Sequence, residues 1–254
     1  MTLAAPYSPD RSLKGKLRRR WARVVHRRPL ESRFDHPVVS ISFDDAPLSA
    51  ATVGAEVLQA NGARGTYYVC AGLDDQPGHM GDYADRRLYA DLSVRGHEIA
   101  CHTFSHLDCG KAAAADILDN VDRNAEALAE VALQTTHFAY PYGDVSPGAK
   151  RALQGRFSSL RALHPGLVRR GSDLNQLPAV GIEGRDGEAH AERWIDRALA
   201  QSAWLILYTH DVRDQPSGWG CTPPALDRLI RRAKAGGAEI LPVGTVLRGR
   251  THAT

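Results

Sequence analysis

Two histidines, His102 and His106, are the residues in this chain whose type and spacing first suggest chemistry. They follow a short apolar run that ends at Cys101. A helical turn would place positions i and i+4 on one face, so that both imidazoles reach one ion. Neutral imidazole is the commonest protein ligand for zinc-type metals. A chain with 11 histidines produces this spacing by chance as well, so the hypothesis depends on partners elsewhere in the chain.

Two adjacent carboxylates, Asp44 and Asp45, supply such partners at the end of an apolar run over 38–43. Neighbouring strand residues point to opposite faces, but Ala46-Pro47 ends the strand and allows both side chains into one site. One carboxylate with two imidazoles makes a three-ligand site with open positions, which suits catalytic zinc or a similar divalent ion. The other carboxylate then remains free as a general base. The alternative is that the aspartate pair caps the next helix.

A further histidine, His210, ends the very apolar run 204–208. Most histidines in such a position are structural. Opposite a bound cation, however, His210 becomes a candidate general acid, because its pKa is open to adjustment near neutrality. Asp211 either orients the loop that follows or is simply exposed.

The elements that must position these residues alternate between strand and helix. Hydrophobic patterns, together with Gly and Pro residues that end them, predict both kinds of element. The predicted strands are 38–43, 66–70, 97–101, 136–140, 157–160, 178–182, 204–208 and 239–243. The predicted helices are 49–61, 82–94, 112–132, 189–201 and 223–235. Such alternation predicts parallel strands, and their number favours a distorted α/β barrel of TIM type. The carboxyl ends of parallel strands share one rim, so the aspartate pair, the histidine pair, Tyr140–Gly143 and His210 are expected to converge there. No glycine-rich phosphate loop follows the first strand, which argues against a nucleotide-binding sheet.

Length and composition predict a single globular barrel preceded by a basic arm. With 254 residues, 43% hydrophobic and 24% charged, the chain can bury a core. We divide it into an arm over 1–36, expected to be helical, and a barrel over 37–254. No run reaches the length of a transmembrane segment, no apolar region of a secretory signal is seen, and the four cysteines form no C-x-x-C pair. We therefore expect a cytoplasmic protein with buried thiols.

The basic arm concentrates the positive charge. Residues 11–30 hold nine Lys and Arg and no acid, and removing these nine from the formal net charge of +3 leaves −6 for the rest. An apolar stripe runs along this stretch through Leu13, Leu17, Trp21 and Val24. Three explanations stay open: the stripe packs on the barrel, residues 11–28 lie on an anionic membrane surface, or the arm binds nucleic acid. The last is the least favoured, because no nucleic-acid module accompanies it.

Four motifs in order resemble those of the polysaccharide deacetylases, the NodB-like carbohydrate esterases. They are Ser42-Phe43-Asp44-Asp45, His102-Thr103-Phe104-Ser105-His106, Phe138-Ala139-Tyr140-Pro141-Tyr142-Gly143 and Leu207-Tyr208-Thr209-His210-Asp211. The resemblance spans about 38–245 and implies a NodB-homology fold, a distorted (β/α) barrel. It also implies metal-dependent removal of an acyl group, most often N-acetyl, from an amino sugar or polysaccharide.

Carried over residue by residue, the resemblance implies that Asp45, His102 and His106 bind the metal, with Asp44 as base and His210 as acid. It further implies that the backbone of Tyr142, after Pro141, helps to hold the oxyanion, and that Leu207 and Tyr208 lie near the pocket for the acyl methyl group. The expected cofactor is a divalent metal, Zn²⁺ before Co²⁺, Ni²⁺ or Mn²⁺.

The chain also departs from the family pattern. Ala46 stands where the family usually has Gly, and Ala139 stands where an Arg usually pairs with the base. Arg161 or Arg170 is a candidate to replace that charge, and Asp173 is a candidate to orient the catalytic histidine. The missing Arg leaves an alternative function open, a non-catalytic carbohydrate-binding barrel with a residual metal site.

Overall fold

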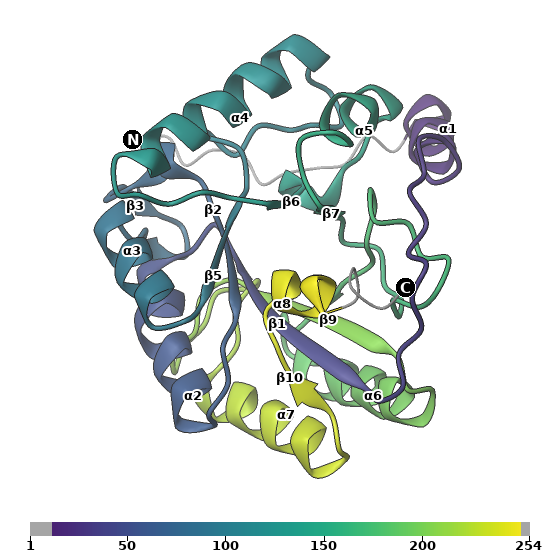
Figure 1. Cartoon of the computed structure of the whole chain (residues 1–254). Coiled ribbons are helices and arrows are strands. Elements are labelled where there is room, and N and C mark those ends of the chain that lie inside the picture. The colour runs from purple at the N-terminus through teal and green to yellow at the C-terminus, as the bar shows by residue number, and fades with distance from the viewer. Residues whose placement is uncertain (1–11, 250–254) are drawn as a thin grey trace.

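A curved parallel sheet forms the centre of the molecule. The structure, a computed structural model, describes residues 12–249. The strand order is β7-β6-β5-β2-β1-β9-β8, and β10 pairs with β1. Helices surround the sheet (Figure 1). Within the described residues β7 and β8 do not pair, and the gap is filled by the segment 162–179, whose Ala162 amide donates to Leu177 O at 2.9 Å. The sheet is therefore a half-barrel, and the predicted distorted (β/α) barrel is confirmed.

The bounds of the elements are as follows. The strands are β1 Val38–Asp44, β2 Thr66–Val69, β3 Pro77–Gly78, β4 Gly81–Asp82, β5 Glu98–Cys101, β6 His137–Ala139, β7 Ser159–Arg161, β8 Val180–Gly181, β9 Trp204–Thr209 and β10 Glu239–Ile240. The α-helices are α1 Leu13–Ala22, α2 Ala55–Ala60, α3 Arg86–Val94, α4 Ala114–Ala129, α5 Pro147–Leu153, α6 Gly187–Ala200, α7 Pro223–Ala235 and α8 Val243–Arg248. The described residues also include three short helices of other types. These are the π-helix η1 Ala50–Gly54 and the 3-10 helices η2 Ala71–Leu73 and η3 Pro141–Gly143.

Alternation along the strands decides which side chains enter the site. In β1 the odd positions Val39, Ile41 and Phe43 pack in the core shared with the outer helices. The even positions face the inside of the half-barrel, where Ser42 Oγ donates to Leu207 O at 3.0 Å and Asp44 ends the strand. A period of two is the ordinary geometry of a strand, and here it separates the packing face from the chemical face.

The sequence placed the main elements correctly but missed several short ones. The helix expected over 49–61 begins as the π-helix η1 and continues as α2. The strand expected over 239–243 pairs only at Glu239–Ile240, because Pro242 precedes the short helix α8. Helix α5 was not predicted, although Ser146 followed by Pro147 supplies a cap and a proline at the first position.

Helix α1 lies within the predicted basic arm and packs beside α5 (Figure 1). Residues 1–11 of that arm, and 250–254 at the other end, lie outside the described residues. None of the helices in the described range is long and apolar enough to span a bilayer. The four cysteines are free thiols and all are buried, as predicted.

Candidate active site

The structure brings Asp45, His102 and His106 together at the carboxyl ends of β1 and β5. Asp45 Oδ1 lies 3.3 Å from His102 Nε2 and 3.2 Å from His106 Nε2, and one ligand atom from each residue falls within 4.8 Å of the other two. Burial raises the pKa of the Asp45 carboxyl, but the two imidazoles outweigh it and hold that pKa well below its usual range. Burial also lowers the pKa of His106 to about 4, although Asp45 opposes the shift. At neutral pH the cluster is therefore a carboxylate with a neutral His106, the form in which these side chains bind metals.

The His102 ring is held by the neighbouring strand. Its Nδ1 lies 2.8 Å from Ala139 O, and an acceptor there requires the proton on Nδ1. The lone pair of Nε2 is therefore directed at Asp45. A hydrogen bond of this kind, behind a metal ligand, fixes both its tautomer and its orientation.

The two histidines are brought together by a loop, so the helical turn expected from their spacing was wrong. Residues 102–106 form no helix, and Thr103 and His106 have φ values of 64° and 55°. Asn120 on α4 holds the loop by accepting from the amides of Phe104 at 2.8 Å and Ser105 at 3.0 Å. No motif indicated Asn120; its place in α4 could be predicted, but its partners depend on how α4 packs.

Left-handed backbone conformations gather around the cluster. Besides Thr103 and His106, Asp45, Ala46 and Tyr142 have φ values of 60°, 49° and 59°. Each costs a residue other than Gly about 1 kcal/mol or more, and such strain persists at functional sites where the surroundings enforce it. Ala46, at the position where the family usually has Gly, is one of them, so the substitution keeps the backbone shape at an energetic cost.

The free carboxylate, Asp44, forms an ion pair with Arg161. Arg161 Nη2 donates to Asp44 Oδ1, and both side chains are buried. The guanidinium also stacks on the Tyr68 ring, with its carbon 4.7 Å from the ring centroid. Burial raises the pKa of Asp44, but the Arg161 charge and then the histidine charges overcome this and lower it. Asp44 is thus ionised at neutral pH, as a proton acceptor must be.

Arg161 reaches Asp44 from the strand beside Ala139. β6 and β7 are parallel, and their register pairs Ala139 directly with Arg161. The alanine leaves room inside the half-barrel for the longer side chain from the next strand. Of the two predicted replacements for the missing Arg, only Arg161 contacts Asp44, and Arg170 is exposed in the turn before Gly171.

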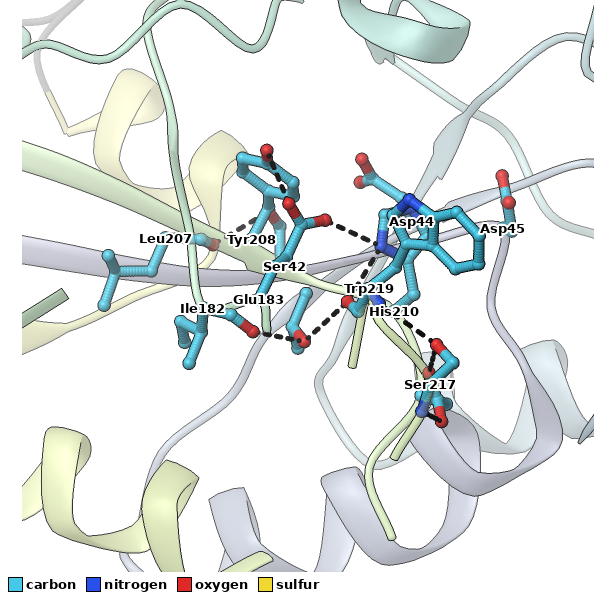
Figure 2. A network of polar contacts seen from close by, with 12 residues as sticks. Ser42, Asp44, Asp45, Ile182, Glu183, Leu207, Tyr208, His210, Ser217 and Trp219 are labelled. Carbon is cyan, nitrogen blue, oxygen red and sulfur yellow. Dashed lines mark hydrogen bonds and ion pairs between the residues drawn. The ribbon is translucent and has the colours of Figure 1, made fainter. Parts of the chain in front are cut away.

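His210 is held by Glu183, which the sequence did not indicate. His210 Nδ1 lies 3.2 Å from Glu183 Oε1, and Tyr208 Oη donates to Glu183 Oε2 at 3.1 Å (Figure 2). Burial lowers the pKa of His210, but the Glu183 hydrogen bond and the charges of Asp45 and Asp44 raise it to about 9. The imidazole is therefore protonated at neutral pH. Glu183 follows β8, so the rule that polar residues at strand ends enter the site would have found it.

The prediction that Asp173 orients the catalytic histidine was wrong. Asp173 Oδ2 lies 2.5 Å from the Nζ of Lys150, and its Oδ1 accepts from the Arg28 amide at 2.9 Å. These contacts tie the segment before β1 to α5. Asp173 lies in the irregular segment between β7 and β8 and does not directly follow a strand, whereas Glu183 does.

The loop after β9 is organised by Asp211, which is fully buried. Asp211 accepts from the Ser217 amide at 2.8 Å and from Ser217 Oγ at 2.5 Å. The loop places Trp219 beside His210, whose amide donates to Trp219 O at 3.2 Å. The Trp219 ring is 44% exposed and packs edge-on against His79. An exposed indole at the rim is suited to stacking against a sugar face.

The residues predicted around the acyl group divide between the two faces of the sheet. The Leu207 side chain is fully buried in the core with the outer helices and points away from Asp44 and Asp45 (Figure 2), so its assignment to the acyl pocket was wrong. Strand alternation sends Tyr208 the opposite way, toward Glu183. Pro141 is buried in η3, and the Tyr142 ring packs edge-on against His106 with centroids 4.3 Å apart. The oxyanion role of the Tyr142 amide stays a prediction.

The residues present fit a divalent cation. Asp45 Oδ1 is buried without a hydrogen-bond donor, and a bare carboxylate oxygen in that position is costly unless a cation neutralises it. One oxygen and two imidazole nitrogens are the donor set of catalytic zinc sites that keep positions open for water or substrate. Beside Tyr208 and Glu183, a cavity of about 380 Å³ extends over β8 toward His190 and Arg193 of α6.

Together, the fold and the site define an α/β half-barrel with a three-residue candidate metal centre, an ionised carboxylate and a protonated histidine at one rim. Comparison with known proteins agrees with this class. Residues 31–155 match the sequence model of the family described as polysaccharide deacetylase. The resemblance seen in the motifs is thereby confirmed over residues 31–155.

Two relatives from Arthroderma benhamiae each match less than half of this chain. A probable peptidoglycan-N-acetylglucosamine deacetylase is 32% identical over 111 residues, which is 43% of this chain and 24% of the relative. A chitin deacetylase is 30% identical over 108 residues, 41% of this chain and 27% of the relative. The chain thus spans about a quarter of the length of these relatives.

Solved structures support the same fold. The Xyl-CE4 domain of a multidomain xylanase from the hindgut metagenome of Trinervitermes trinervoides superposes with a TM-score of 0.62 at 16% identity, covering 85% of this chain and 92% of that one. The family match ends before Arg161, Glu183 and His210, so the contacts of these three residues come from the structure of this chain.

Proposed function

We propose that this protein is a metal-dependent hydrolase that removes an acyl group, most often N-acetyl, from an amino sugar or polysaccharide. The observation that carries the proposal is the grouping of Asp45, His102 and His106 within 4.8 Å, next to an ionised Asp44 and a protonated His210. Amide hydrolysis needs a base for the attacking water and an acid for the leaving nitrogen, and the site holds both.

A divalent cation held by Asp45, His102 and His106 would supply Lewis-acid polarisation of the acyl oxygen and lower the pKa of water. Asp44 accepts the proton of the attacking water, while Arg161 keeps the carboxylate ionised. His210, with Nδ1 turned to Glu183, donates the proton from Nε2 to the leaving amine. The C–N bond then breaks, and the products are a free amine and a carboxylic acid.

Carbohydrate is the substrate class that the surroundings favour. The two curated relatives are named as a probable peptidoglycan-N-acetylglucosamine deacetylase and a chitin deacetylase. On this chain the exposed Trp219 ring and the cavity beside Tyr208 offer a stacking surface and room for a sugar ring. Among cations we propose Zn²⁺, because the nitrogen-rich donor set suits it better than Mn²⁺.

The alternative, a carbohydrate-binding barrel without catalysis, rested on the Arg missing at Ala139. Arg161 supplies a guanidinium to Asp44 from the adjacent strand. The missing Arg at position 139 is therefore no longer a reason to favour the alternative.

The proposal is tested by metal analysis together with acetate release from N-acetylated glycans. The parent protein should retain about one equivalent of metal and release acetate, while Asp45→Ala should lose both, because the site keeps only two neutral ligands. Asp35→Ala, which removes an exposed carboxylate outside the sheet, is the matched control and should retain both. Parent-level acetate release by Asp45→Ala would refute the proposal.

A further inference from the structure

Helix α1 and the turn that follows it present an apolar stripe to solvent. The side chains of Leu13, Leu17, Trp21 and Val24 are 79%, 66%, 60% and 60% exposed, and they make up half of the eight large apolar side chains exposed in the described part of the chain. The opposite face of the helix carries Gly15 and Ala22, and these are its buried residues. The stripe therefore does not pack on the barrel, which was one of the explanations open from the sequence.

The body of the protein fixes this orientation. The fully buried Lys150 on α5 donates from Nζ to Ala22 O at 2.7 Å. Arg18 Nη2 lies 2.7 Å from Asp144 Oδ2 on the loop that leads into α5. Small residues on the inner face let α1 approach α5 closely (Figure 1). A helix anchored on its small face leaves its apolar face free for another surface.

The stripe is bordered by positive charge. Exposed Lys14 lies along one edge, and exposed Lys16, Arg20 and Arg23 lie along the other. The described stretch 12–30 contains no Asp or Glu. Apolar side chains flanked by cations, with acids absent, are the pattern of helices that lie in the interface of an anionic membrane.

We propose that α1 docks this protein onto an anionic lipid bilayer, with the stripe among the acyl chains and the flanking cations at the headgroups. The charge of the helix favours a lipid bilayer over a second copy of the protein or a nucleic acid. A second copy seated on the same stripe would bring two cationic helices together without an acid to pair them. Nucleic acid would use the cations but would leave the row of Leu, Trp and Val side chains without a partner.

Docking would also bring α1 and the neighbouring loop over 142–144, which adjoins the catalytic rim, to the membrane surface. Asp144, which holds Arg18, lies two residues after Tyr142, whose ring contacts His106. An acylated sugar carried at the membrane surface would then lie within reach of the site; this last step alone rests on the proposed function.

The test is flotation of the full chain with vesicles of phosphatidylcholine alone or mixed with phosphatidylglycerol. We expect binding to the anionic vesicles and little to the neutral ones. The variant Leu17→Ser/Trp21→Ser should bind the anionic vesicles about a hundredfold more weakly, because each of the two large apolar side chains contributes about tenfold when buried. Lys16→Gln/Arg20→Gln should lose about fivefold per cation. Val94→Ser, which removes an 89% exposed apolar side chain from α3, is the matched control and should bind like the parent.

Equal binding by the parent and the stripe variant, or no binding to any vesicle, would overturn the proposal. So would a concentration-dependent dimer that the stripe variant abolishes in the absence of lipid. Thermal unfolding of each variant checks that the barrel is intact. Acetate release from a soluble substrate separates the two proposals, because stripe variants should retain it, whereas Asp45→Ala should lose it and still float with anionic vesicles.

Discussion

Removing Arg161 tests whether its guanidinium keeps Asp44 ready to accept a proton. Both side chains are buried and in contact, so the charge is poorly screened. Two unit charges about 4 Å apart interact by about 4 kcal/mol at an effective dielectric constant of about 20, equivalent to about three pKa units. Measured shifts for an Asp beside an Arg are about one to three units. Arg161→Met should therefore raise the pKa of Asp44 by an amount in that range.

The assay is the pH dependence of kcat/KM for acetate release. In the proposed mechanism Asp44 acts as the carboxylate, so activity should be lost as pH falls through its pKa. Because Arg161 lowers that pKa, its removal should move the acid limb up by about one to three pH units and leave the alkaline limb in place. The ion pair stabilises the fold above the unfolded pKa of Asp44, and Arg161→Met should cost about 3–5 kcal/mol of unfolding free energy at neutral pH.

A second variant keeps the test valid if Arg161→Met folds poorly. Ala139 is the direct neighbour of Arg161 in the sheet, so Ala139→Arg/Arg161→Ala moves the guanidinium back by one strand. This variant should recover much of the stability and return the acid limb toward the parent value. Arg170→Ala removes an exposed guanidinium and should leave both limbs unchanged. A folded Arg161→Met protein with the parent acid limb would refute the reasoning.

Three further perturbations address the other contacts of the site. Glu183→Gln should lower the pKa of His210 from about 9 by about one unit or more. The alkaline limb of the rate profile should then move to lower pH, because His210 must stay protonated to act as the proposed acid. An unmoved limb would show that Glu183 does not keep His210 protonated. Asp173→Ala should lower the free energy of unfolding by about 3–5 kcal/mol, because it leaves the charge of buried Lys150 without its carboxylate. Both limbs of the pH–rate profile should stay in place. A shifted alkaline limb would show that Asp173 does orient His210, as the sequence had suggested. Asn120→Ala should weaken metal binding by about 10–100-fold in a competition assay with a chelator, while Asn120→Asp, which keeps the accepting oxygen, should retain most of the affinity; equal affinity in Asn120→Ala would contradict its role in holding the loop.

The sequence was sufficient for the parts of the site that follow from strand geometry. Asp44, Asp45, His102 and His210 each follow an apolar run, and parallel strands place such residues at one rim whatever the loops do. The same rule applied to β8 would have found Glu183, but its short, irregular strand gave a weak pattern. The assignment of Leu207 failed for the opposite reason, because motif position was followed where strand alternation would have sent that side chain to the outer core.

The contacts that could not be predicted depend on the register between strands and on loop conformation. The spacing of His102 and His106 suggested a helical turn, whereas the chain uses left-handed residues held by Asn120 on α4. The grouping of His102 and His106 with Asp45 was predicted correctly, although the helical turn from which it was predicted does not form. Its position therefore depends on tertiary packing as much as on the motif.

The exchange of Arg and Ala between β6 and β7 shows why a missing motif residue is weak support for lost function. What Asp44 requires is a cation at one point inside the half-barrel, and two adjacent strands can both reach that point from paired positions. Ala139 leaves the volume that the Arg161 side chain fills, so each residue makes sense only with the other. Restoring Arg at position 139 while Arg161 remains should therefore be harmful, because two guanidiniums would compete for one carboxylate in a buried space. The single variant Ala139→Arg should unfold at a lower temperature than the double variant, whereas additive effects of the two substitutions would show that the positions do not share one role.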